Sequence, residues 1–481
     1  MLCKIVIRDE INCKLEGLDA DTRRRLVAKF KYEVPYARHL PSVKLGRWDG
    51  KVAYFQLGGS TYINLLPEVL EWLTERNWDF EIDDQRENRQ SFQFTQVDSN
   101  TFSKKTWPAA HPNAGQPIVL RDYQIDIINK FLCDTQCVQE VATGAGKTIM
   151  TAALSLMIEP YGRSIVIVPS KSLVIQTEAD YVNLGLDVGV YFGERKELGR
   201  THTICTWQSL NSLYKSSKGA GNEWNTMINV AAIIVDEVHQ VKQEVLKALL
   251  TTEFAHVPIR WGLTGTIPKE AFEKVALIVS VGQVISQLTA SELQERGVLS
   301  NCHVNIVQTV EHSDFKNYQE ELKYLTTNKD RLDHVASFLS EVIKTGNTLV
   351  LVDRRECGEE LVARLPNSVF VQGDMKNAKR KEHYDEIANV SDKIIVATYG
   401  VAAVGINVPR IFNLVLIEPG KSFVRVIQSI GRGIRKAEDK DFVQIWDLTA
   451  DCKFAKRHLT KRKQFYREAN YPFTQEKSIY K

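Results

Sequence analysis

A glycine-rich segment in the second quarter of the chain has the composition of a phosphate-binding loop. Its residues are Ala142, Thr143, Gly144, Ala145, Gly146, Lys147 and Thr148. Gly144 and Gly146 let the backbone approach a phosphate without a Cβ clash, so that amide groups can point at its oxygens. The helix expected from Ile149 to Met157 adds a favourable dipole at its N-terminus.

Lys147 and Thr148 carry the side chains that such a loop uses on a nucleotide. Lys147 would neutralise the charge of the β- and γ-phosphates, and the Thr148 hydroxyl would ligate Mg²⁺. The sequence departs from the usual pattern at Val141, where a glycine is expected. The alternative is a glycine-rich turn with a chance Gly-Lys-Thr, so the motifs further along the chain must decide.

An acidic pair, Asp236 and Glu237, directly follows the apolar run Ala232–Val235. If that run is a buried parallel strand, the pair lies at the edge of the sheet where such proteins bind ligands. Asp236 is suited to hold Mg²⁺, and Glu237 to orient and deprotonate an attacking water. The alternative is that Asp236 caps a helix beside a solvated glutamate. The chain has no His-Glu-x-x-His sequence, which excludes a metalloprotease of that type.

A third motif, Gln428–Arg435, places Arg432 and Arg435 three residues apart. This spacing predicts that both arginines lie on one helix face. Arginine is always charged and can fork onto a γ-phosphate, which is the logic of an arginine finger. The alternative, a solvated basic helix face, would have to explain the whole Gln-x-x-Gly-Arg-x-x-Arg pattern, so we favour the finger. Together the three motifs predict ATP and Mg²⁺ as cofactors.

Short apolar runs alternate with helical segments in two successive stretches, as expected of parallel sheets with helices on both faces. The first stretch has Ser164–Val168, His202–Thr206, Ala232–Val235 and Arg260–Thr264. The second has Thr348–Val352, Val369–Gln372, Ile394–Ala397, Leu414–Ile417 and Val443–Trp446. We therefore expect two tandem parallel-sheet domains, joined near Leu288–Ser300.

The first hundred residues have a different pattern and predict a small α+β domain. Strand-like runs at Cys3–Arg8 and Lys51–Gln56 are mixed with helical stretches at Ala20–Phe30 and Leu66–Glu75. A polar, proline-containing stretch then predicts a linker. The expected division is an N-terminal domain at 1–100, a linker at 101–116, and parallel-sheet domains at 117–295 and 296–481.

The composition is that of an ordinary globular protein: 43% of the 481 residues are hydrophobic and 25% are charged. The formal net charge of +3 does not identify a partner, because basic residues can line one groove of a nearly neutral chain. The eight cysteines lack zinc-site spacing and predict reduced thiols. With neither a signal peptide nor a membrane-length apolar run, we expect a soluble protein in the cytoplasm of a bacterium or a phage-infected host.

These motifs, in this order, resemble those of superfamily 2 helicases of the DExH type over roughly residues 119–448. The resemblance implies two RecA-like domains and further site residues. It assigns adenine recognition to Arg121 and Gln124, a nucleotide contact to Gly405, and nucleic-acid contacts to Ser170, Lys171, Thr206, Gln208 and Thr398. It also assigns to Leu263–Thr266 the coupling of hydrolysis to domain movement. Where many members carry aspartate, this chain has Asn407.

Within the superfamily the chain is most similar to the phage UvsW-type branch-migrating helicases, through Leu120–Gln124, the Asp-Glu-x-His motif and Gly46–Lys51. The resemblance implies an ATPase that translocates on DNA and remodels forks and Holliday-type junctions in recombination, repair and replication. We expect branched or forked DNA as partner, no membrane, action as a monomer, and work alongside replication and recombination proteins.

Basic and aromatic residues are interleaved between positions 29 and 55, a combination that suits single strands and junctions. Arg47, Trp48 and Lys51 are the DNA-binding candidates there. The equally weighted alternative is a small module whose aromatic residues are its core, Trp48 foremost. A second basic stretch, Lys453–Arg467, is better interpreted as a packed terminal helix with a solvated face.

Two other functions fit the same motifs. An RNA helicase would have identical nucleotide chemistry, and only the N-terminal resemblance argues for DNA. An ATPase that acts as a conformational switch in a larger DNA-processing complex, such as a restriction assembly, is the second. No convincing nuclease constellation occurs in the chain, so any cleavage would belong to a partner.

Overall fold

The computed structural model describes residues 1–86, 91–109, 113–373, 375, 383, 386, 390–401, 410–437 and 439–480. The chain divides into two compact units, and each is described by itself. The first comprises Met1–Glu140 and Gly146–Gln287, and the second comprises Val141–Ala145 and Leu288–Lys481. The domain boundary predicted near Leu288–Ser300 thus coincides with the change of unit.

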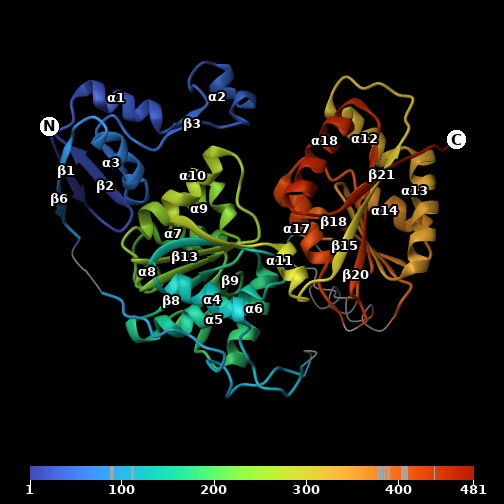
Figure 1. The fold of residues 1–481 in the computed structure, drawn as a ribbon, viewed down its shortest axis with the longest axis horizontal. Helices are drawn as coiled ribbons and strands as arrows, with labels where there is room; N and C mark the ends of the chain where they lie inside the picture. Colours follow the sequence, from blue (N-terminus) through green and yellow to red (C-terminus); the bar gives the residue numbers. More distant parts are fainter. Residues whose placement is uncertain are drawn as a thin grey trace. The chain divides into compact units, whose positions relative to one another are not determined.

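The N-terminal part of the first unit is an α+β module built on a four-stranded sheet of order β5-β2-β1-β6 (Figure 1). Strands β1 and β2 are antiparallel, β1 and β6 are parallel, and β3 and β4 form a separate hairpin. The elements are β1 (Leu2–Ile7), β2 (Asn12–Glu16), α1 (Ala20–Lys29), β3 (Lys31–Glu33), α2 (Pro41–Lys44), β4 (Lys51–Ala53), β5 (Ser60–Tyr62), α3 (Leu66–Thr74) and β6 (Asp79–Asp84).

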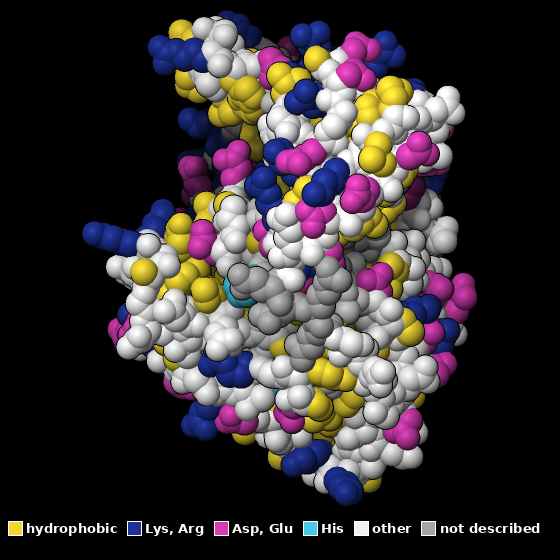
Figure 2. Space-filling view, turned by 90° about the vertical axis from the view of Figure 1, so that its left-hand side faces the viewer, with side chains coloured by type: hydrophobic (Ala, Val, Ile, Leu, Met, Phe, Trp, Pro, Cys, Tyr) yellow, Lys and Arg dark blue, Asp and Glu magenta, His cyan; other side chains and the backbone are white. Residues whose placement is uncertain are grey.

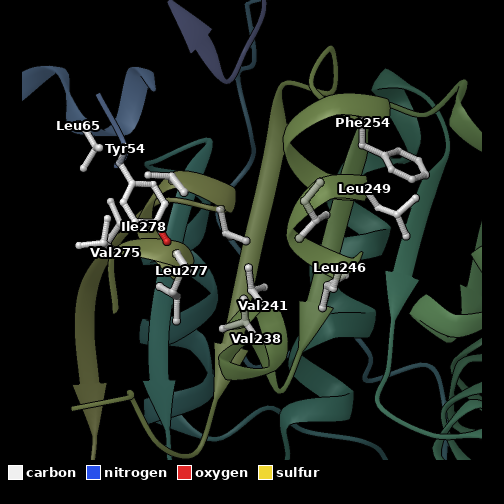
Figure 3. Close-up of a cluster of buried hydrophobic side chains, with 14 of the residues drawn as sticks. Tyr54, Leu65, Val238, Val241, Leu246, Leu249, Phe254, Val275, Leu277 and Ile278 are labelled. Atoms are coloured by element: carbon white, nitrogen blue, oxygen red, sulfur yellow. The ribbon is translucent and has the colours of Figure 1, made fainter. Parts of the chain in front are cut away.

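The N-terminal module shares a hydrophobic core with the parallel-sheet part of its unit. Tyr54 and Leu65 of the module lie beside Val275, Leu277 and Ile278 of a helix that follows the sheet (Figure 3). Polar contacts reinforce this junction: the amides Asn64–Gln136 and Gln283–Asn64 are hydrogen bonded, and Lys247 lies 5.4 Å from the Tyr54 ring centroid. The module is therefore fixed to the first sheet by packing.

The first parallel sheet has eight strands in the order β10-β9-β11-β8-β12-β13-β7-β14. Strands β9, β11, β8, β12, β13 and β7 are parallel, and β10 is antiparallel to β9. The elements are α4 (Asp122–Leu132), β7 (Gln136–Val141), α5 (Lys147–Ile158), β8 (Ser164–Ile167), α6 (Lys171–Leu184), β9 (Val188–Phe192), β10 (Arg195–Lys196), β11 (His202–Cys205), α7 (Trp207–Ser217), α8 (Asn222–Ile228), β12 (Ala232–Asp236), α9 (Glu244–Ala248), β13 (Ile259–Thr264), α10 (Ala271–Ser280) and β14 (Gln283–Leu288).

Helices cover both faces of this sheet, as predicted: α4, α5 and α6 lie on one side, and α7, α8 and α10 on the other (Figure 1). The four predicted strands of this stretch are β8, β11, β12 and β13, each within one residue of its expected start. Their central residues are buried because helices cover both sides, which is why the sequence shows continuous apolar runs.

The stretch that we predicted as a linker is partly packed against the first sheet. Val97 and Phe102 are buried, and the backbone amide of Val97 donates to the side chain of Asn129 on α4. Just before it, the rings of Phe92 and Phe94 each lie 5.2 Å from that of Tyr161. These contacts anchor the connection, so the N-terminal module is not loosely tethered within its unit.

The second unit has a seven-stranded sheet of order β17-β18-β16-β19-β20-β15-β21, parallel throughout. Helices α13 and α14 cover one face of the sheet, and α17 and α18 cover the other (Figure 1). The elements are α11 (Ala290–Glu295), β15 (Asn301–Thr309), α12 (Tyr318–Thr327), α13 (Lys329–Val342), β16 (Thr348–Val352), α14 (Arg355–Arg364), β17 (Ser368–Val371), β18 (Ile394–Thr398), β19 (Asn413–Ile417), α17 (Phe423–Gly433), β20 (Phe442–Ala450), α18 (Lys453–Glu468) and β21 (Phe473–Ser478).

All five strands predicted for the second stretch are present, as β17, β18, β16, β19 and β20. The outer strands β15 and β21 were not predicted. The cysteines are free thiols, and Cys133 is the exposed one. Among the described residues, no helix combines the length and the apolar character that crossing a bilayer requires.

Candidate active site

The glycine-rich loop connects β7 to α5, as its sequence predicts. Gly144 has a φ of +93° and Gly146 a φ of +85°, a left-handed conformation that side-chain-bearing residues rarely adopt. Helix α5 then begins at Lys147, so Lys147 and Thr148 occupy its first turn. The loop therefore ends at a helix N-terminus, the arrangement that favours a phosphate group.

Gln124 lies against this loop. Its side chain is buried, and its Oε1 accepts a hydrogen bond of 3.0 Å from the backbone amide of Arg121. A Cβ added to Gly146 would lie only 2.7 Å from Gln124 Nε2, so the glycine makes room for this amide. The Arg121 guanidinium donates to the Tyr123 hydroxyl at 3.0 Å. The two residues assigned to adenine recognition are thus held together at the start of α4.

Asp236 and Glu237 lie at the carboxyl end of β12, as predicted. Asp236 is the last residue of the strand, and its Oδ1 accepts a 3.0 Å hydrogen bond from the next backbone amide. Glu237 has a φ of +52°, a strained backbone for a residue with a side chain. The helix-cap alternative for Asp236 is wrong, because Asp236 is a strand residue and the N-cap position of the following 3₁₀ turn belongs to Glu237.

The side chain of Glu237 is buried at the centre of a polar cluster. One carboxylate oxygen lies 3.3 Å from Lys147 Nζ, and the other accepts a 3.3 Å hydrogen bond from Thr264 Oγ1. His239 Nδ1 lies 3.4 Å from the same carboxylate and 2.9 Å from Thr264 Oγ1. Sequence reasoning missed His239 as a site residue, although the histidine of the Asp-Glu-x-His motif was the available signal.

Thr264 and Thr266 extend this cluster into the segment after β13. Thr264 Oγ1 accepts a 3.2 Å hydrogen bond from the backbone amide of Thr266. Thr266 Oγ1 is buried and has no hydrogen-bond partner among the described residues. Glu237 and the segment assigned to coupling are therefore connected through one threonine hydroxyl.

Excess negative charge at the end of β12 matches the chemistry of a bound cation. Burial and the neighbouring charge of Glu237 raise the pKa of Asp236 to about 6, and Lys147 offsets part of this effect. A divalent cation held by Asp236 and Thr148 would relieve that repulsion. The left-handed glycines leave the backbone open to a phosphate. The residues present therefore fit ATP with Mg²⁺, and Lys147, Thr148 and Asp236 are the ones that would hold them.

In the second unit, the arginine motif lies on α17 and just beyond it. Gln428 is buried within the helix, and Arg432 is in its last turn. The prediction that both arginines share one helix face is wrong, because α17 ends at Gly433 and Arg435 forms an isolated β-bridge with Leu299.

The physical reason for this early helix end lies in Gly433 and Lys440. Glycine has a low helix propensity, and the buried Lys440 ammonium donates a 2.9 Å hydrogen bond to the carbonyl of Gly433. This bond satisfies the end of the helix and turns the chain before Arg435. Lys440 was not recognised from the sequence.

The predicted nucleic-acid contacts of the first unit gather at one edge of its sheet. Ser170 follows β8 and Thr206 follows β11, and these strands are parallel to each other and to β12. Both hydroxyls act as helix caps, accepting 3.3 Å hydrogen bonds from backbone amides. Gln208 and Lys171 are exposed beside them. The accessible groups at this edge are therefore the amide and the ammonium.

The remaining candidates are spread over other parts of the chain. Thr398 ends β18 and is half-buried, whereas Gly405 and Asn407 lie outside the described residues. Arg47 and Lys51 are exposed, and the half-buried Trp48 donates its indole N–H to the Lys51 carbonyl at 2.9 Å. The face that includes the N-terminal module shows Lys and Arg side chains interspersed with Asp and Glu (Figure 2).

Two family profiles match the chain. Residues 117–269 match the profile described as type III restriction enzyme, res subunit, and residues 330–437 match the helicase conserved C-terminal domain. These ranges carry the phosphate loop, the acidic pair and the arginine motif. The chain belongs to the superfamily 2 helicases. As a helicase it is an ATP hydrolase, and its two parallel-sheet domains are the RecA-like domains of that family.

Individual proteins extend this comparison. The chain is 23% identical over 464 residues to the ATP-dependent DNA helicase uvsW of Enterobacteria phage T4, covering 92% of this chain and 89% of the relative. It is 25% identical over 288 residues to a DNA 3'-5' translocase of Sulfurisphaera tokodaii, covering 58% and 60%. Its fold is similar to a fragment assigned to an HsdR subunit of a type I restriction enzyme from Vibrio vulnificus. That structure has a TM-score of 0.58 and 18% identity, with 97% of this chain and 84% of the other covered.

Proposed function

We propose that this helicase is an ATP-driven DNA translocase that remodels branched DNA, by fork regression and branch migration of Holliday-type junctions. The observation that carries the proposal is the extent of the similarity to the T4 DNA helicase, which spans 92% of this chain and so reaches beyond the helicase domains. A relative that matched only the two motor domains would not speak to the N-terminal module.

The same proposal gives each site residue a role. ATP with Mg²⁺ supplies the free energy of the cycle. Lys147 and Thr148 bind the phosphates and the cation, and Asp236 holds the cation through water. Glu237 orients and deprotonates the attacking water, while the 3.3 Å contact with Thr264 fixes its carboxylate. Arg432 and Arg435 act on the γ-phosphate as arginine fingers, with Gln428 as their partner in the motif.

The grip on DNA is proposed to come from the sheet edge of the first unit and from the N-terminal module. Lys171 and Gln208 are exposed and suit contacts to phosphates, which give grip without reading sequence. Arg47 and Lys51 add charge on the module. The packed core around Tyr54 means that the module would move together with the first sheet. We place this activity in the cytoplasm, on a monomer.

A second candidate function is that of a motor subunit in a larger DNA-processing assembly. It is favoured by the match of residues 117–269 to a restriction-enzyme subunit and by the fold similarity to the HsdR fragment. Such a subunit would hydrolyse ATP by the same chemistry. It would displace no strand by itself.

Purified protein assayed on a labelled Holliday-type junction and on a forked duplex separates the two functions. The proposal predicts ATP-dependent conversion of the junction into its duplex products by the wild type, and none by Lys147→Ala. Hydrolysis of ATP without any strand displacement or junction conversion would support the motor-subunit function and contradict the proposed one.

A further inference from the structure

Helix α18 in the second unit presents a basic face that none of the helicase motifs uses. Its sixteen residues include seven lysines and arginines and a single glutamate. Ala455, Leu459, Phe465 and Tyr466 are buried against the unit. The opposite face is exposed and carries a row of cations: Lys453, Lys456, Arg457 and Lys461.

These cations are not neutralised by neighbouring side chains. Within the part of the chain that the structure describes, Lys456, Arg457 and Lys461 have no carboxylate oxygen within 4.0 Å. Elsewhere in the unit the exposed Lys344 and Arg364 are each paired with a carboxylate. A row of unpaired cations on one face is electrostatically costly for the protein alone and favours a polyanion.

Lys421, in the segment before α17, adds to the same positive region. Burial, followed by the charges of Arg462 and Lys421, lowers the pKa of His458 on α18 to about 4. His458 is therefore neutral at physiological pH. Its response shows that Lys421 lies close enough to α18 to act on a titrating group there.

The basic helix is held rigidly from beneath. Arg462 forms a buried two-point ion pair with Asp447, with N···O distances of 2.8 and 2.9 Å, and the Tyr466 hydroxyl donates to the same aspartate. The Glu321 carboxylate accepts hydrogen bonds from the first backbone amides of α18. Because Glu321 occupies the helix N-terminus, an external anion would meet the side of the helix and not its end.

Nearby aromatic rings contact one another and are not free to stack on bases. The Tyr318 ring lies 4.8 Å from the His458 ring and 6.3 Å from the Phe454 ring, in edge-to-face geometry. Recognition of single strands depends on open aromatic faces, whereas a duplex offers mainly its phosphates. The surroundings of α18 therefore fit a backbone and not unstacked bases.

We propose that the exposed face of α18, together with Lys421, binds the phosphate backbone of a duplex DNA arm without reading its sequence. Lys453 and Lys461 are eight residues apart, about 12 Å along the helix, and a duplex carries about seven phosphates over that length. The inference rests on the proposed function, because it supplies that enzyme with a second duplex contact beyond the motif residues.

The test is the salt dependence of DNA binding by the full-length protein, measured by fluorescence anisotropy with a labelled blunt duplex and its labelled single strand. Arg457→Ala/Lys461→Ala is compared with Lys329→Ala/Lys344→Ala, which removes two exposed cations from α13 on the other face of the sheet. The α18 variant should lose about 1.8 from the slope of log K against log salt for duplex, at about 0.9 per phosphate. The α13 variant should keep the wild-type slope. Thermal melting checks that both variants are folded.

The outcomes distinguish this inference from the proposed function. If the wild type binds neither DNA, the proposed function fails. If the wild type binds duplex and the α18 variant keeps its slope, the α18 surface is not a DNA contact and the proposed function stands. Equal losses in both variants would show a general charge effect, and a loss confined to single strand would show the wrong partner. Each of these last two results overturns the inference.

Discussion

The Lys147 ammonium lies 3.3 Å from a carboxylate oxygen of Glu237, and both side chains are about nine-tenths buried. One lysine thus neutralises part of the charge of the residue proposed as general base, while its own sequence motif assigns it to the phosphates. A nucleotide that draws Lys147 toward its phosphates would leave Glu237 held by Thr264 and His239, with its carboxylate available to a water.

The role of Glu237 is tested by Glu237→Gln. Glutamine keeps the shape and can still accept the Thr264 hydrogen bond, but it cannot take a proton from water. We expect ATP turnover to fall by about 10²–10⁴-fold while ATP binding persists. Steady-state hydrolysis and filter binding of labelled ATP measure the two quantities separately. Loss of binding together with turnover would show that Glu237 acts on nucleotide affinity instead.

Asp236 should reduce stability when it is charged. Its pKa is raised from 3.8 to about 6 by burial and by Glu237, so the folded state holds a proton that the unfolded state releases. The free energy of unfolding therefore falls as pH rises from about 4 to 6, and it stays lower above that window. Asp236→Asn removes the charge and should stabilise the nucleotide-free protein at pH 7.5 by about 1–3 kcal/mol.

Melting temperatures of Asp236→Asn and the wild type at pH 5 and pH 7.5 check this prediction. The variant should melt higher at pH 7.5, and the difference should shrink at pH 5, where the wild-type carboxyl is mostly protonated. The same variant should lose Mg²⁺-dependent hydrolysis. A variant that melts below the wild type at pH 7.5 would contradict the charge argument.

Arg432→Lys tests the arginine-finger proposal. Lysine keeps the charge but cannot fork onto two phosphate oxygens, so we expect turnover to fall by about 10³-fold with ATP binding retained. Arg425→Lys is the matched control on the same helix. Arg425 lies 2.7 Å from Asp353, an ion pair that lysine can replace, and near-wild-type turnover is expected there. Equal losses in the two variants would point to disruption of α17 and not to loss of a phosphate contact.

The Arg462–Asp447 pair should be a strong determinant of stability in the second unit. Both side chains are almost fully buried, so Arg462→Ala leaves a buried charge unpaired and should cost about 3–5 kcal/mol. Hydrogen exchange of β20 and α18 reports on this unit directly. Protection should drop there while strands of the first unit keep theirs. The double variant Arg462→Met/Asp447→Leu should recover much of the loss, and failure to recover would assign the effect to packing alone.

Much of the strand arrangement could be predicted because parallel strands are buried on both faces. The apolar runs that became β8, β12 and β16 are continuous for that reason. Strand β7 was missed because it contains Gln139, a polar residue that is fully buried. Its amide donates to the Ile127 carbonyl and its oxygen accepts from Ser286, contacts that no local pattern announces.

The active site was predicted in its residue types but not in its detailed geometry. Motif spacing located Lys147, Asp236 and Glu237. The left-handed backbone of Glu237 and its contact with His239 depend on tertiary packing around β13 and could not be predicted from spacing. Arg435 was misplaced because the helix periodicity of the motif continues past Gly433, where a distant lysine ends the helix.

The most direct measurement of the central claim is the steady-state ATPase rate at fixed salt with four cofactors: single-stranded DNA, linear duplex, a Holliday-type junction and structured RNA. Lys147→Ala is the control and should lose turnover by at least about 10²-fold, because its ammonium supplies charge at the phosphates. Salt is fixed because phosphate-driven binding falls steeply with ionic strength. We predict the strongest stimulation by the junction. Stimulation by RNA alone would contradict the DNA-remodelling function, and near-normal hydrolysis in Lys147→Ala would contradict the nucleotide site itself.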